Sequence, residues 1–403
     1  SNMKNALLIF AFLSFYLSSV HGSVEIRSNK LTTGDGLANN SIRYMFQDSK
    51  GFMWMGTVNG LSYYDGNSFV SIYPDPNLPV SLADPRIRNM EEDSNVFLWI
   101  ATLSSLYSCY DLKHGRFVDF TGCGEYKQSY SKKIIASDQS VWLWDNNNGC
   151  RRVVYQNGQF SSQAYKKESG NLSSDEVLFV YESNDSPGHV WIGTRQGLWK
   201  YHEGKLEAMD TQGESWEHIF SYDQYTCIIT GKKEIYRHSL SNNRLEKIAS
   251  LTELGDTGVI TGSLRLQHQW VMFTATGSYI LDPVTGKLRR FSRLNIKNGN
   301  VTRDNKGNAW VHNYTGNVWY VNTSTGDIKP FQFLSSEHLG YIDVERYSII
   351  HDSRDIIWIT TYGNGLFAYD LNTGGLQHFT FEVSHSSHIN SNYLQYIIED
   401  RSG

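Results

Sequence analysis

Short apolar runs separated by polar turn residues follow one another along almost the whole chain. Within many runs, apolar and polar positions alternate, and Ile, Val, Tyr, Phe and Trp are frequent. Alternation with period two and this composition are typical of half-buried β-strands. The first clear group predicts four strands, at 42–47, 53–57, 61–64 and 68–73. Helical periodicity is confined to short stretches, so the pattern predicts an all-β protein.

The four-strand pattern repeats roughly every 43 residues, and a tryptophan marks the second strand of most copies. The series is Trp54, Trp99, Trp142, Trp191, Ile229 (a stand-in), Trp270, Trp310 and Trp358. A fixed period of this size indicates stacked supersecondary units, and four antiparallel strands in this length are typical of a propeller blade. The Trp is therefore predicted to pack between neighbouring blades.

Turn residues recur in register with the tryptophans. An aspartate lies six residues before the marker position in six copies: Asp48, Asp93, Asp185, Asp223, Asp304 and Asp352. A later turn pairs a polar residue with a glycine four positions on: Asp111 and Gly115, Asp282 and Gly286, Asn322 and Gly326, and Asp370 and Gly374. Because Asp bonds its own backbone and Gly accepts positive φ, both patterns predict hairpin turns and structural aspartates.

Charge and cysteine content exclude several classes of function. The net charge of −5 argues against nucleic acid as a partner, because phosphate binding requires a basic surface. The four cysteines, Cys109, Cys123, Cys150 and Cys227, form no CxxC pair, so neither a metal nor a cofactor is expected. A disulfide among the first three and buried free thiols both remain open.

The two ends of the sequence carry further signals. Residues 1–2 look like a tag scar, and residues 3–22 have the apolar stretch and small flanking residues of a secretory signal peptide, which predicts an exported mature chain. Residues 393–403 repeat the opening strand and Asp-x-x-Gly turn of a unit. From the spacing, we expect the natural protein to continue beyond Gly403.

Residues 36–66 contain Asp48, Gly51, Trp54, Gly56-Thr57 and Gly60-Leu61, and this arrangement resembles the two-component regulator propeller repeat. The resemblance extends over about residues 30–403 and is clearest in units one, four and eight. Proteins of this family carry two seven-bladed propellers, a β-sandwich, a membrane helix, a histidine kinase and a response regulator. The resemblance thus implies that this chain is part of a periplasmic sensor region.

The family's architecture implies a seven-bladed propeller over 23–340 and the start of a second propeller, truncated within a blade, over 341–403. The bare count of eight units allows one eight-bladed ring instead. An additional strand at 24–30 could supply the closing strand of the last blade, but the sequence leaves open which blade it joins.

The resemblance also implies a function. The chain would be the ligand-sensing domain of a hybrid sensor histidine kinase of the inner membrane, bind an oligosaccharide and control polysaccharide-utilisation genes. The fragment itself would not be an enzyme. The full-length protein would be a homodimer that contacts the membrane only through segments beyond this chain.

The repeat register places two sets of loops around the mouth of the central funnel, which is the default ligand site of such a fold. Candidate ligand-binding residues near the start of the first strands and between the second and third strands are Arg43, Arg88, Lys133, Arg195, Trp216, His218, Lys232, Tyr314, Arg346 and Tyr362. Aromatic faces stack on sugar rings, and Arg binds carboxylate or sulfate bidentately. These residues predict an acidic or sulfated oligosaccharide as the ligand.

Two other classes of function remain open. A secreted polysaccharide lyase or glycoside hydrolase would need facing carboxylates, for which Glu176, Glu217, Asp343 and Glu345 are the candidates. A propeller that binds other proteins would need no catalytic group. Continuation of the reading frame into a membrane helix and a kinase would favour the sensor.

Overall fold

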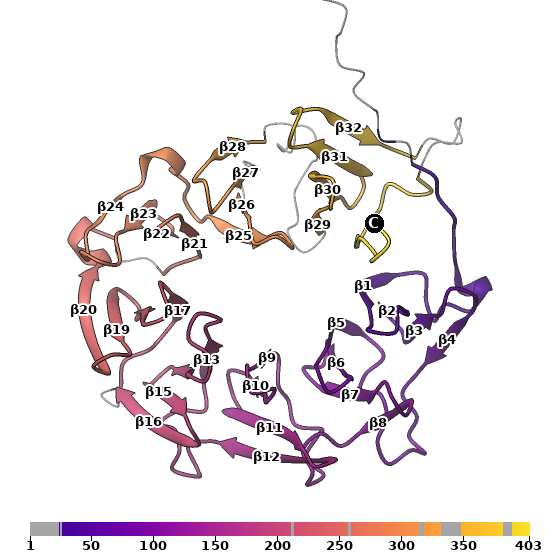
Figure 1. Cartoon of the computed structure of the whole chain (residues 1–403), viewed down its shortest axis with the longest axis horizontal. Helices are drawn as coiled ribbons and strands as arrows, with labels where there is room; N and C mark the ends of the chain where they lie inside the picture. The colour runs from indigo at the N-terminus through magenta and orange to yellow at the C-terminus, as the bar shows by residue number, and fades with distance from the viewer. Residues whose placement is uncertain are drawn as a thin grey trace, which may run out of the picture.

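The computed structural model describes residue 24 and residues 26–210, 213–256, 259–313, 318–331, 348–381 and 389–403. Eight four-stranded antiparallel sheets follow one another along these residues and are arranged in a ring (Figure 1). The prediction of an all-β propeller with four-stranded blades is therefore confirmed. Within the described ranges, no helix combines the length and the apolar composition that a membrane span requires.

The strands of each blade are consecutive in the sequence. The first four blades contain β1 (Ile42–Gln47), β2 (Met53–Thr57), β3 (Leu61–Tyr64), β4 (Phe69–Ile72); β5 (Ile87–Glu92), β6 (Phe97–Thr102), β7 (Tyr107–Asp111), β8 (Arg116–Val118); β9 (Lys132–Ile135), β10 (Val141–Trp144), β11 (Cys150–Gln156), β12 (Gln159–Tyr165); and β13 (Val177–Glu182), β14 (Val190–Thr194), β15 (Gly197–His202), β16 (Lys205–Asp210).

The last four blades are built in the same way. They contain β17 (His218–Ser221), β18 (Thr226–Thr230), β19 (Glu234–Ser239), β20 (Arg244–Ser250); β21 (Gly262–Leu266), β22 (Gln269–Phe273), β23 (Ser278–Leu281), β24 (Leu288–Arg290); β25 (Asn300–Arg303), β26 (Ala309–His312), β27 (Val318–Val321), β28 (Ile328–Pro330); and β29 (Ser348–His351), β30 (Ile356–Thr360), β31 (Leu366–Asp370), β32 (Leu376–Phe379). Three short 3-10 helices are Thr33–Asp35, Leu251–Leu254 and Ser292–Leu294.

The expectation of a seven-bladed ring followed by the start of a second ring is wrong, because the eighth sheet lies in the same ring as the first seven. The physical reason is the packing of the eighth sheet on the seventh. Trp310 of β26 shares a buried cluster with Ile357 and Ile359 of β30, as the tryptophans of earlier blades do with their neighbours. The proposed domain boundary at residue 340 lies outside the described residues.

Neighbouring blades are held together by the side chains of their second strands. Trp54 packs with Ile87 and Met90 of the second blade, and Trp99, Trp142 and Trp191 occupy the corresponding clusters with the third, fourth and fifth blades. All of these indoles are buried. Gly56 allows the close approach, since a Cβ there would lie 2.4 Å from a methyl group of Ile87. The predicted role of the tryptophans is thus confirmed in these blades.

The marker residues of units five and six face the other way. Ile229 packs with the preceding blade, and its neighbour Ile228 faces the sixth blade instead. Trp270 stacks on Phe220 of the preceding blade, with ring centroids 3.4 Å apart, while Val271 faces the seventh blade. Because side chains alternate between the faces of a strand, a shift of one residue moves a side chain to the opposite interface. Ile229 and Trp270 were therefore wrongly aligned with Trp54.

The aspartate before the tryptophan closes the turn between the first and second strands. Asp48 accepts hydrogen bonds from Lys50 N (2.9 Å), Phe52 N (2.9 Å) and the indole N–H of Trp54 (2.8 Å). Asp93 and Asp352 bind Trp99 and Trp358 in the same way. In the described part of the chain, the indole nitrogens of Trp142, Trp270 and Trp310 have no hydrogen-bond acceptor. Among the described marker tryptophans, the bond is thus present at Trp54, Trp99 and Trp358.

The predicted turns between the third and fourth strands are confirmed, and a threonine closes a further turn after the second strand. After the second strand, a threonine hydroxyl binds the glycine carbonyl that follows, as in Thr57 to Gly60 (2.7 Å) and Thr194 to Gly197 (3.0 Å). Between the third and fourth strands, each polar residue accepts from backbone N–H groups before a glycine with positive φ. These turns are at Asp111 and Gly115, Asp282 and Gly286, Asn322 and Gly326, and Asp370 and Gly374.

The segment from Ile389 to Gly403 lies between the eighth and first blades (Figure 1). Glu399 accepts from Ser353 N of the eighth blade at 3.1 Å, as Glu92 accepts from Ser49 N at 2.7 Å. The segment thus contacts the eighth blade as an innermost strand contacts the blade before it. On its other side, Arg401 donates to the carbonyl of Asp48 at 2.7 Å. We call residues 389–403 the closing segment.

Other predictions about the ends and the cysteines have mixed outcomes. Residues 1–23, including the predicted tag scar and signal peptide, lie outside the described residues. Val24 bonds the side chain of Gln377 in the outermost strand of the eighth blade, but residues 26–30 form no strand.

All four cysteines are free. Cys109, Cys150 and Cys227 are buried, and burial raises the pKa of each thiol, whereas Cys123 is exposed.

Replacing Asp48 by Ala is expected to lower the free energy of unfolding by about 2–4 kcal/mol, because three N–H donors lose their acceptor and each buried loss costs about 1–3 kcal/mol. Urea unfolding followed by tryptophan fluorescence measures this. Asp65→Ala is the control, since exposed Asp65 also accepts two backbone N–H groups but binds no indole; it should cost less than about 1 kcal/mol. Equal losses would contradict a special role of the indole bond.

Replacing Arg401 by Ala is expected to destabilise the ring by about 1–2 kcal/mol, since its guanidinium donates to the carbonyls of Asp48 and Ser49. Proteolysis within the closing segment should become faster at the same time. Arg116→Ala is the control, because Arg116 is exposed on β8 and has no partner among the described residues. If thermal unfolding and proteolysis are the same for both variants, Arg401 does not help to close the ring.

Candidate functional site

The first strand of every blade lies innermost, around the centre of the ring (Figure 1). Four predicted ligand-binding residues lie on these strands: Arg43 on β1, Arg88 on β5, Lys133 on β9 and His218 on β17. Three others lie between second and third strands: Arg195 after β14, Lys232 after β18 and Tyr362 after β30. Tyr314 and Arg346 lie outside the described residues.

Arg195 joins the fourth and fifth blades rather than standing free. Its Nε lies 3.1 Å from Glu176 Oε2, and its Nη1 lies 3.2 Å from Glu217 Oε1. The Arg195 and Glu176 side chains are 41% and 51% exposed, so each pair contributes at most about 1 kcal/mol. Both described acidic candidates for catalysis are therefore engaged with one guanidinium. Asp343 and Glu345 lie outside the described residues.

Arg88 and Lys133 are also engaged. Arg88 donates to the carbonyl oxygen of Ser131, and Lys133 pairs with Glu91, so both contacts join the second and third blades. The Lys133 side chain is only 6% exposed. Its ammonium group is therefore buried and already paired with a carboxylate.

Trp216 is 1% exposed, and its indole N–H donates to Asp210 at 2.9 Å. It belongs to the buried cluster between the fourth and fifth blades, where its face is covered. One signal in the sequence could have revealed this, because Asp210 lies six residues before Trp216, as Asp48 lies before Trp54. Trp216 thus has the structural role of the repeat tryptophans in this structure.

His218 is half-buried, and burial lowers the pKa of its imidazole. Glu217 opposes this effect, and Lys132 on β9 adds to it. Since the ordinary His pKa is already near 6.5, the ring is neutral at pH 7. It can accept or donate one hydrogen bond to a ligand, but it supplies no positive charge.

Three predicted residues keep accessible groups. Among the described residues, Arg43 and Lys232 form no hydrogen bond or ion pair, and both are exposed. Tyr362 is 45% exposed and lies against Tyr393 of the closing segment, with ring centroids 5.1 Å apart. Tyr393 is itself 64% exposed. The two rings form an exposed aromatic pair that sequence reasoning found only in part, because Tyr393 comes from the next repeat.

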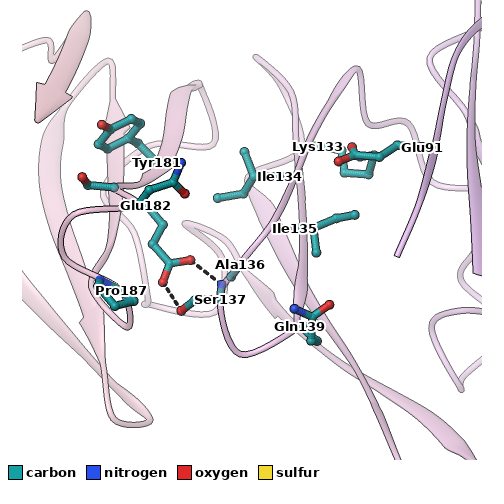
Figure 2. A pocket seen from close by; sticks show the side chains of 12 residues that line it. Glu91, Lys133, Ile134, Ile135, Ala136, Ser137, Gln139, Tyr181, Glu182 and Pro187 are labelled. Atoms are coloured by element: carbon teal, nitrogen blue, oxygen red, sulfur yellow. Dashed lines mark hydrogen bonds and ion pairs between the residues drawn. The ribbon is translucent and has the colours of Figure 1, made fainter. Parts of the chain in front are cut away.

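A pocket of about 570 Å³ lies where β5, β9 and β13 run side by side (Figure 2). Its two carboxylates are both bound. Glu91 pairs with Lys133, and Glu182 accepts from Ser137 N at 2.7 Å and from the Ser137 hydroxyl. Lys133 is the one predicted residue in its lining. Ser137 is uncharged and does not compensate the carboxylate of Glu182, so this pocket suits hydroxyl, amide and apolar groups better than an anion.

Metal chemistry finds no support in the described residues, since no three His, Cys, Asp or Glu side chains among them come close enough to hold an ion. The aspartates that repeat along the chain are spread over different blades, each in its own turn. They act on backbone and indole N–H groups.

Comparison with known proteins identifies one repeat. Residues 36–59 match the family model described as "Two component regulator propeller". This segment contains β1 and β2 and includes the Asp48 to Trp54 bond. No curated protein matches the chain.

Several solved structures are similar in fold. The extracellular domains of two putative hybrid two component systems of B. thetaiotaomicron, BT3049 and BT4673, are 18% and 17% identical to this chain, with TM-scores of 0.41 and 0.43. They cover 90% and 94% of this chain, which spans 55% and 57% of theirs. Saccharomyces cerevisiae Sqt1 is 11% identical, with a TM-score of 0.48, and the match covers 71% of this chain and 83% of Sqt1.

At such values, similarity to solved structures does not assign a function. The family match is more specific, because it falls on the repeat whose Asp, Trp, Gly and Thr residues have the structural roles described above. The resemblance seen in the sequence is therefore confirmed: at residues 36–59, the chain carries a two-component regulator propeller repeat.

Proposed function

We propose that this chain is the ligand-sensing part of an extracytoplasmic sensor of the two-component type and that its ligand is an oligosaccharide. The observation that carries the proposal is the family match at residues 36–59. The exposed aromatic pair of Tyr362 and Tyr393 supports a sugar ligand, since such rings offer flat apolar faces. The pair lies beside the connection between β30 and β31, in one of the loop sets predicted to bind ligand.

The wider role follows from the same proposal. The chain would lie in the periplasm as the sensor region of an inner-membrane hybrid histidine kinase and would control polysaccharide-utilisation genes. Two copies would associate in the full-length protein. Ligand binding can alter signalling only if the ligand prefers one arrangement of the sensor over another. The closing segment is a suitable place for such a preference, because Tyr393 and Arg401 bring it into contact with both neighbouring blades.

A protein-binding propeller is the second candidate. Phe381 and Tyr393 are 39% and 64% exposed, and both lie next to Asn392, which bonds the backbone of Phe381. Together with Tyr362, they form three exposed aromatic side chains near the eighth blade. Aromatic residues are enriched in the centres of protein interfaces, so this surface also fits a protein partner.

Titration calorimetry with a panel of neutral and acidic oligosaccharides tests the proposal. We expect at least one to bind the wild-type chain and Tyr362→Ala to weaken it about fivefold, because an aromatic contact contributes about 1 kcal/mol. Tyr225→Ala is the matched control. Tyr225 is 56% exposed but lies in the turn before β18, at the other end of its blade.

Two results would count against the sugar ligand. Failure of every oligosaccharide to bind the wild-type chain is the first, and equal affinities of the Tyr362 and Tyr225 variants for a bound oligosaccharide would remove Tyr362 from the site. Sedimentation analysis of the same variants addresses the second candidate. Self-association that Tyr362→Ala abolishes and sugars leave unchanged would favour a protein partner.

A further inference from the structure

A second pocket, of about 340 Å³, lies between the sixth and seventh blades, and none of the residues predicted to bind ligand lines it. It is lined by the start of β21, the whole of β25 and the end of β26. Its volume is in the range of small-molecule sites, which begins at roughly 300 Å³. One or two sugar rings would fill it.

The lining is polar and carries one positive charge. It includes Thr261, Ser263, Asn300, Thr302, Arg303 and His312, and none of its eight residues is acidic. The pocket in Figure 2 differs in this respect, because the carboxylates of Glu91 and Glu182 line it. Only Arg303 supplies a full charge here, since burial lowers the pKa of His312 to about 4 and leaves its ring neutral at pH 7.

Arg303 is unpaired because the sixth blade departs from the repeat. Arg303 is the last residue of β25, and the corresponding residues Glu92 and Glu182 bond the preceding blade's turn at Ser49 and Ser137. In the sixth blade, Leu266 pairs with Gln269, so its turn has only two residues. Arg303 finds no hydrogen-bond acceptor or carboxylate among the described residues.

The short turn of the sixth blade forms hydrogen bonds with another part of the seventh blade. Gln267 N donates to Thr323 O at 2.8 Å, and the Gln267 side chain donates to Thr325 O at 2.9 Å. Both contacts lead to the connection between β27 and β28, near the outside of the seventh blade. The turn is therefore held away from the end of β25, where Arg303 lies.

The surroundings of Arg303 favour an anion. Its side chain is exposed to solvent, yet the nearby protein lowers the pKa of the guanidinium by removing part of its hydration. Because an arginine remains charged in proteins, this loss of hydration destabilises the folded state. An oxyanion that pairs with Arg303 would offset the cost through charge-assisted, bidentate hydrogen bonds.

We propose that this pocket binds the acidic group of a sugar, with Arg303 on the carboxylate or sulfate and the hydroxyl and amide side chains around it on the ring hydroxyls. The inference rests on the proposed function, since it names the ligand class of the sensor and moves the charged contact from Arg195 to Arg303. Arg195 already has two carboxylate partners, whereas Arg303 has none.

Calorimetric titration of the whole chain with D-glucuronate, glucose 6-sulfate, glucose and inorganic sulfate tests the proposal. One or both acidic sugars should bind, glucose should bind at least tenfold more weakly, and Arg303→Met should reduce acidic-sugar affinity about tenfold. Arg289→Met is the matched control, because exposed Arg289 on the outermost strand of the same region has no partner among the described residues. Thermal unfolding confirms that each variant is folded.

Ser263→Ala separates a sugar from a free anion, and it should weaken the acidic sugars while leaving sulfate unchanged. Sulfate binding as tightly as the acidic sugars would overturn the proposal, as would equal effects of Arg303→Met and Arg289→Met. An oligosaccharide that binds the wild-type and Arg303→Met chains equally would leave the sensor function intact and exclude this pocket. Absence of binding by every sugar and oligosaccharide would instead contradict both proposals.

Discussion

The ring depends on one interaction, the packing of each sheet's second strand on the face of the next sheet. Trp54, Trp99, Trp142, Trp191 and Trp310 lie in the buried clusters at five of these interfaces. A sheet with two apolar faces cannot be stable alone, so each blade requires both neighbours. This requirement also explains the closing segment, which packs against Trp358 of the eighth blade.

Most of the fold could be predicted from the sequence, because strand alternation and turn chemistry act locally. The four strands of the first unit and the Asp, Thr and Gly turns agree with the structure. Alignment of the weak units could not be predicted in the same way. In unit five the marker was placed one residue too late, at Ile229, and in unit six one residue too early, at Trp270. Both residues were therefore assigned to the wrong face of the sheet. The number of blades was wrong because it was taken from the seven-bladed propellers of the family and not from the eight repeats in the sequence.

The place of the candidate residues in the repeat could be predicted, but their partners could not. The register correctly placed Arg43, Arg88 and Lys133 on innermost strands. It could not show that Lys133 pairs with Glu91, because a neighbouring blade supplies the carboxylate through a contact between strands 42 residues apart in the sequence. Trp216 was a different case, since its Asp210 partner was visible in the sequence and the spacing of six had already been recognised elsewhere.

Function in such a ring is best sought where the repeat is broken. A repeated residue that keeps its neighbour uses its hydrogen bonds for assembly, as Asp48, Glu92 and Glu399 do. When one residue of a hydrogen-bonded pair between two blades is replaced, the other residue of the pair is left without a partner. The apolar packing between the two blades is kept. The sixth blade keeps its apolar contacts with the seventh through Leu264 and Val271 but has a two-residue turn. Arg303 is consequently available for a ligand, whereas Arg195 and Lys133 are bound to carboxylates.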